Sequence, residues 1–126
     1  MKKLIWTLQI LLALAMTGAG IMKITKAPAD LRADPAMAWA NDFTDTQIKL
    51  IGAAEVAGAV GLIVPAATGI AVFLTPLAAA LLGVLMGGAV WTHIRRDEPF
   101  TVPLVITLLL FVTAYLRFAN PPAKKS

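Results

Sequence analysis

Residues 50–94 read LIGAAEVAGAVGLIVPAATGIAVFLTPLAAALLGVLMGGAVWTHI and contain one residue that is charged at neutral pH, Glu55. A membrane-spanning helix needs about 20 mainly apolar residues, so this stretch is long enough for two spans. Turn signals at Pro65 and at Thr68-Gly69 divide it in the middle. We therefore expect a tight antiparallel hairpin of two helices, near 48–65 and 70–94.

Two further stretches without charge, 4–22 and 99–116, flank this hairpin. Pro99 suits the first position of a helix, and the acidic residues just before it would lie beside the positive helix end. The sequence therefore predicts a single domain over residues 1–126 with an all-α fold. It is an integral membrane four-helix bundle, whose outer helices lie near 4–25 and 99–118.

The composition agrees with a membrane protein and excludes several other classes. Hydrophobic residues make up 59% of the 126 residues and charged residues only 14%. A chain this small has too little interior to hide so much apolar surface from water, so a soluble globular domain is excluded. The chain has no cysteine, which excludes disulfides, thiol catalysis and cysteine-ligated metal. The net charge of +4 comes from residues scattered beside apolar runs, which favours phospholipid headgroups over nucleic acid as the anionic partner.

The one long loop, residues 26–47, is expected to carry a short interfacial helix. Asp34-Pro35 suits an N-cap and first turn for a helix through Ala36–Ala40. Its apolar side chains would rest on the membrane interface, because tryptophan favours the headgroup layer; they are Met37, Trp39 and Phe43. The alternative is a plain solvated loop.

The orientation of the bundle depends on a small difference in positive charge. Four spans place both termini on one side of the membrane, and the positive-inside rule favours the cytoplasm for that side by a narrow margin. Lys2-Lys3, the apolar run and Thr17-Gly18-Ala19 also resemble a cleavable signal peptide. The apolar run continues to Met22, however, which makes it long enough to span the membrane.

We single out three ionisable residues within the predicted spans: Lys23, Glu55 and His93. Such residues are costly in a bilayer and are functional candidates by default. The alternating direction of the helices places all three in the same half of the bilayer. Small residues surround them at helical spacing, so these faces are expected to point into the bundle. We interpret them as a buried polar or ligand site, with Trp91 and Met86 as candidate pocket walls.

Structural alternatives exist for each of these residues. Glu55 could pair with Lys23 only to lock two helices together, Lys23 could extend to the interface, and His93 could be an interfacial residue at a helix end. One histidine and one glutamate do not make a metal site, so no metal is expected. No catalytic residue can be assigned.

The ordered set of motifs resembles the DoxX-like family of small bacterial four-helix membrane proteins. The resemblance rests on GAGIMK (18–23), IGAAEVAGAVGLIVP (51–65), TGI (68–70), LTPLAA (74–79) and GAVWTHIRRDE (88–98). It implies four spans with lysine, glutamate and histidine at matching positions. For function, it implies an association with redox or oxidative-stress systems, because the family's namesakes resemble a subunit of thiosulfate–quinone oxidoreductases.

We therefore expect a multi-pass protein of the bacterial inner membrane, acting as an accessory subunit of a quinone-linked redox system. A quinone is the candidate ligand, no cofactor is intrinsic, and no autonomous enzyme activity is expected. A membrane or peripheral redox protein would be the partner. One alternative is a non-enzymatic module that binds a lipid or a partner protein. Another is a small transporter, which would have to form a homodimer to enclose a path.

Overall fold

The computed structural model describes residues 1–125, which form four long helices, one short helix and one 3-10 helix. All four long helices are long and apolar enough to cross a membrane. The all-α membrane bundle predicted from the sequence is therefore confirmed for this part of the chain. In chain order the elements are α1 (Lys2–Thr25), α2 (Pro28–Ala33), the 3-10 helix η1 (Pro35–Asp42), α3 (Asp45–Thr68), α4 (Leu74–Arg95) and α5 (Thr101–Ala119).

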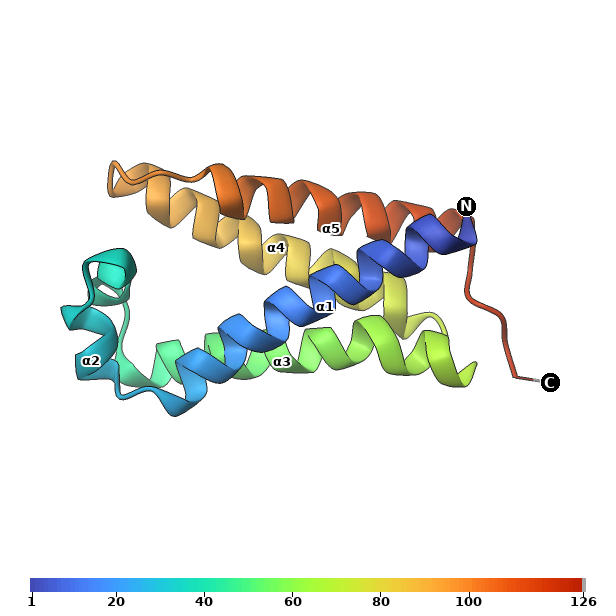
Figure 1. The fold of residues 1–126 in the computed structure, drawn as a ribbon, viewed down its shortest axis with the longest axis horizontal. Helices are drawn as coiled ribbons and strands as arrows, with labels where there is room; N and C mark the ends of the chain where they lie inside the picture. Colours follow the sequence, from blue (N-terminus) through green and yellow to red (C-terminus); the bar gives the residue numbers. More distant parts are fainter. Residues whose placement is uncertain (126) are drawn as a thin grey trace.

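The long helices pack as two pairs, α1 on α3 and α4 on α5, and the pairs meet mainly through α3 and α4. Both chain ends lie at one end of the bundle, and the α2–η1 segment (residues 26–44) lies at the other (Figure 1). The core between the pairs draws apolar side chains from all four long helices, including Met16, Leu62, Leu82 and Leu110. The outward-facing side chains are largely apolar, which suits a lipid environment.

The turn between α3 and α4 lies later in the chain than predicted, because α3 continues through Pro65 to Thr68. Proline has no N–H, so the carbonyl of Gly61 loses its partner within the helix. Thr75 in α4 replaces that partner: its Oγ1 donates a hydrogen bond of 3.1 Å to the Gly61 oxygen. The helix ends where Gly69 adopts a φ of 73°, a left-handed conformation that favours glycine.

The long loop is more ordered than predicted. The helix α2 was not expected, and the expected helix over 36–40 is the 3-10 helix η1. Asp34 is its N-cap, as predicted, since its side chain accepts a hydrogen bond of 2.9 Å from the amide of Ala36. A small buried cluster holds this segment against α3 and consists of Leu31, Ala40 and Ile48.

The predicted start of the last helix at Pro99 is wrong, because α5 begins at Thr101. Asp97 adopts a φ of 57°, which turns the chain back toward α4. The Glu98 carboxylate then contacts His93 and Arg96 at the end of α4. Glu98 therefore offsets positive charge at the end of α4 instead of preceding the first turn of α5.

Candidate functional site

A cavity of about 410 Å³ lies among the four long helices, in the half of the bundle that the α2–η1 segment covers. Small-molecule sites in proteins typically measure about 300–1,000 Å³, so this cavity could hold a ligand ring or headgroup. Its walls are mainly apolar. They include Lys23, Glu55, His93 and Met86, which are residues that the sequence pattern singled out.

The polar centre of this cavity is an ion pair between α1 and α3. Lys23 Nζ lies 2.8 Å from Glu55 Oε1, and the two side chains are 12% and 2% exposed. Side chains on a helix lean toward its N-terminus, so on antiparallel helices these two lean toward each other. Glu55 Oε1 accepts no hydrogen bond of standard geometry from residues 1–125. Glu55 also lines the cavity, and a carboxylate has acceptor sites on both oxygens, so the group as a whole can accept a hydrogen bond from a ligand donor.

The α2–η1 segment supplies the aromatic wall of the cavity. Lys23 Nζ lies 5.4 Å from the centre of the Trp39 ring, within the range of a cation–π contact. Phe43 meets Trp39 edge to face, with ring centres 6.0 Å apart. The sequence placed Met37, Trp39 and Phe43 at the membrane interface. The structure places all of them in the cavity wall, because the segment folds over the end of the bundle.

His93 lines the same cavity but pairs with a different carboxylate. Its Nδ1 lies 3.0 Å from Glu98 Oε1, in the α4–α5 connection, and it makes no ion pair with Glu55. Partial desolvation favours the neutral form of Glu98, but hydrogen bonds from His93 and Arg96 outweigh it and lower the pKa of Glu98 below its usual value. The three residues that the sequence singled out thus line one cavity, but Lys23 pairs with Glu55 while His93 contacts Glu98.

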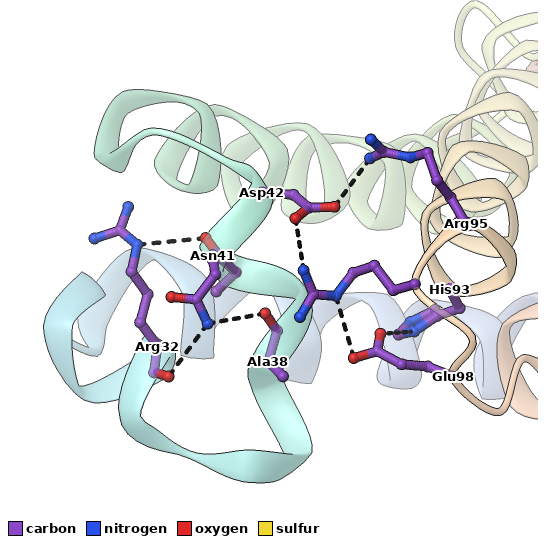
Figure 2. Close-up of polar contacts among 9 residues, drawn as sticks. Arg32, Ala38, Asn41, Asp42, His93, Arg95 and Glu98 are labelled. Atoms are coloured by element: carbon purple, nitrogen blue, oxygen red, sulfur yellow. Dashed lines mark hydrogen bonds and ion pairs between the residues drawn. The ribbon is translucent and has the colours of Figure 1, made fainter.

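A residue that the sequence analysis missed, Asp42, ties the covering segment to α4. Asp42 Oδ2 lies 2.9 Å from Arg95 Nη2, and Asp42 Oδ1 lies 2.6 Å from Arg96 Nη1 (Figure 2). Arg96 also contacts Glu98 at 3.2 Å, which links this bridge to His93. The only sequence signal was the Arg95-Arg96 pair, and nothing in the pattern indicated which acid would meet it.

Trp91 does not line the cavity. Its side chain is 65% exposed on the outer surface of α4. Thr92, the next residue along the helix, is buried and faces inward. A step of one residue rotates the side chain by about 100°, so Trp91 points away from the cavity that His93 and Met86 reach.

A second buried polar group, also missed from the sequence, lies in the other half of the bundle. Gln9 is fully buried in α1 and donates a hydrogen bond of 2.6 Å from Nε2 to the carbonyl of Leu62. Its Oε1 accepts one of 2.7 Å from Arg117 Nε in α5. This group ties three helices together. Arg117 also stacks on Trp6, with its Cζ 5.5 Å from the ring centre.

Comparison with known proteins identifies the family of this chain. No curated protein and no solved structure matches the sequence. A sequence model of the DoxX-like family matches residues 7–115, which include most of each of the four long helices and the Lys23–Glu55 pair, while Arg117 lies just beyond the match. The chain is therefore a multi-pass membrane protein that belongs to the DoxX-like family.

Proposed function

We propose that the cavity binds the ring of a quinone, and that the chain acts as a membrane accessory subunit of a quinone-linked redox system. The observation that carries this proposal is the Lys23–Glu55 ion pair in the wall of an apolar cavity of about 410 Å³. Ligand sites commonly combine apolar walls with a few placed polar groups that orient the ligand.

The chemistry of the pair suits both oxidation states of a quinone ring. The Lys23 ammonium has three N–H donors and can offer one to a quinone carbonyl oxygen. The Glu55 carboxylate, which also lines the cavity, can accept a hydrogen bond from a quinol hydroxyl. Trp39 and Phe43 add aromatic surface, on which a flat ring can stack.

This chain would bind and orient the ring, exclude water and hold a proton near it. It offers the ligand no cysteine, so we assign the electron donor to a membrane or peripheral redox protein. The Asp42 bridge would keep the α2–η1 segment closed over a bound ring.

The test uses Trp39 as an internal reporter of quinone binding. A Trp6→Phe/Trp91→Phe variant keeps only the tryptophan in the cavity wall, and a Trp6→Phe/Trp39→Phe variant keeps only the exposed one. Titration with a short-chain ubiquinone should quench Trp39 fluorescence to a plateau, while Trp91 should show quenching without saturation. Loss of a hydrogen bond to a charged group should weaken binding about tenfold or more in Glu55→Gln and in Lys23→Met.

Equal quenching of Trp39 and Trp91, or an unchanged affinity of Glu55→Gln for the quinone, would contradict the proposed quinone site. Mass spectrometry of lipids that co-purify with the full chain distinguishes the alternatives. A phospholipid retained by the wild type and lost in Glu55→Gln would indicate a lipid-binding module. A proton flux in proteoliposomes that Glu55→Gln abolishes would indicate a transporter.

A further inference from the structure

A second cavity, of about 370 Å³, lies at the end of the bundle that holds both chain ends. We call it the terminal cavity. It lies between the start of α1, the end of α5 and the C-terminal segment that follows. Lys2, Trp6, Arg117 and Asn120 supply its polar lining.

Arg117 is the central feature of this cavity, because it is a buried cation without a buried anion. Its side chain is 4% exposed. Its hydrogen bonds go to neutral groups, Gln9 Oε1 at 2.7 Å and the Asn120 carbonyl at 3.3 Å. Within residues 1–125 no carboxylate lies within 4.0 Å of it. A guanidinium has five N–H donors, so several remain for a ligand.

The positions of the acidic residues in the fold explain why no carboxylate side chain lies near Arg117. All seven acidic residues lie away from the terminal end, in the segment from α2 to η1, in the first half of α3 or in the α4–α5 connection. They are Asp30, Asp34, Asp42, Asp45, Glu55, Asp97 and Glu98. Among residues 1–125, the charged side chains at the terminal end are therefore all positive. Burying a charge costs free energy unless the charge is paired. A bound anion would therefore offset the desolvation cost of Arg117.

The depth of the cavity indicates which anion would reach it. α1 begins at Lys2 and α5 ends at Ala119, so the cavity lies where these two spans leave the hydrocarbon layer. Phospholipid phosphates lie at this level. Arginine binds phosphate through two parallel hydrogen bonds, and basic pockets between spans bind the headgroups of anionic lipids.

We propose that the terminal cavity binds the phosphate group of an anionic phospholipid. Arg117 holds the phosphate oxygens from inside the bundle, and Lys2 holds them from the surface. The apolar part of the wall, which includes Ile5, Ala66 and Pro122, contacts the glycerol end of the lipid. This site is independent of the quinone site in the other half of the bundle.

The test compares two adjacent lysines in the full chain, purified in detergent. Lys2 lines the cavity and Lys3 does not, although both are exposed. Native mass spectrometry with added phosphatidylglycerol measures binding. Lys2→Gln should weaken binding about fivefold, and Lys3→Gln should leave it nearly unchanged. Arg117→Gln should weaken binding about tenfold or more, with Arg117→Lys in between.

Two further binding measurements show whether the bound phosphate belongs to a lipid or is free inorganic phosphate. Phosphatidylcholine should bind more weakly than phosphatidylglycerol, and millimolar inorganic phosphate should not displace the lipid. Binding of inorganic phosphate alone, with the same dependence on Lys2 and Arg117, would overturn the lipid assignment. Equal effects of Lys2→Gln and Lys3→Gln would overturn the site itself, because diffuse charge attraction would then explain the binding. This comparison remains decisive if Arg117→Gln does not fold.

Discussion

Gly20 in α1 and Gly52 in α3 contact each other through their backbones. A Cβ atom on Gly20 would lie 2.6 Å from the Gly52 carbonyl oxygen, and one on Gly52 would lie 2.8 Å from the Gly20 carbonyl oxygen. Only glycine permits this approach, because any side chain would overlap the opposite backbone. This crossing of α1 and α3 also brings the two charged residues together, because Lys23 lies against Gly52 and Glu55 lies against Gly20. The two charged side chains therefore meet beside this backbone contact.

This contact predicts a strong effect for a small substitution. Gly52→Ala should destabilise the bundle by about 1–3 kcal/mol, because the added methyl group must push α1 away from α3. Thermal unfolding in detergent measures the loss. Gly18→Ala is the matched control, since a Cβ at Gly18 meets nothing within 4 Å. It should change stability by less than about 1 kcal/mol. Equal effects of the two substitutions would contradict the proposed role of the crossing.

The two members of the buried ion pair should differ in their effect on stability. Lys23→Met should cost about 3–5 kcal/mol, because Glu55 is 2% exposed and loses its partner in an apolar surrounding. Glu55→Gln should cost less, because the longer lysine side chain can extend toward the interface.

Thermal unfolding of both single variants and of the Lys23→Met/Glu55→Gln double variant checks this asymmetry. The double variant should be more stable than Lys23→Met alone, since it contains no unpaired charge. A double variant whose loss equals the sum of the two single losses would show that the residues do not interact.

The bridge from Asp42 to α4 should control the opening of the α2–η1 segment. Asp42→Asn removes the ion pairs with Arg95 and Arg96. Amide hydrogen exchange in residues 35–44 should become faster by about three- to tenfold, since each such pair contributes up to about 1 kcal/mol. Asp30→Asn removes the same charge from α2 without touching either arginine, and it should leave the exchange rate unchanged. Equal acceleration in both variants would indicate a general charge effect.

Glu98 makes the stability of the fold depend on pH. Its pKa in the folded protein lies below the ordinary value of 4.5, because His93 and Arg96 stabilise the carboxylate against its partial desolvation. A lowered pKa stabilises the fold above the ordinary value, and that contribution is lost as the pH falls through the lower, folded-state pKa.

We therefore expect the stability difference between the wild type and Glu98→Gln to persist from neutral pH down to about pH 5 and to shrink only below the ordinary glutamate pKa. Thermal unfolding of both proteins across this range measures the difference. A difference that disappears between pH 7 and pH 5 would rule out Glu98 as its source.

The errors of the sequence-based prediction have a common cause. Pro65 looked like a helix end, yet α3 passes through it because Thr75, on another helix, supplies the missing hydrogen bond. Asp97 and Glu98 looked like the start of α5, yet Glu98 turns back to side chains on α4. In each case, the local structure depends on a hydrogen bond or ion pair with a residue of another helix. A pattern read along one segment contains no information on such a partner.

The sequence by itself determined that the chain is a four-helix membrane protein and that Lys23, Glu55 and His93 lie within its spans. Both follow from the spacing of apolar and charged residues along the chain, because a bilayer demands long apolar helices and penalises isolated charge. Only the tertiary structure decided that Lys23 pairs with Glu55 while His93 pairs with Glu98, that Trp39 and not Trp91 lines the cavity, and that Arg117 lies buried beside Gln9. Such pairings depend on helix rotation and on distances of a few ångströms between residues far apart in the chain, and packing in three dimensions sets both.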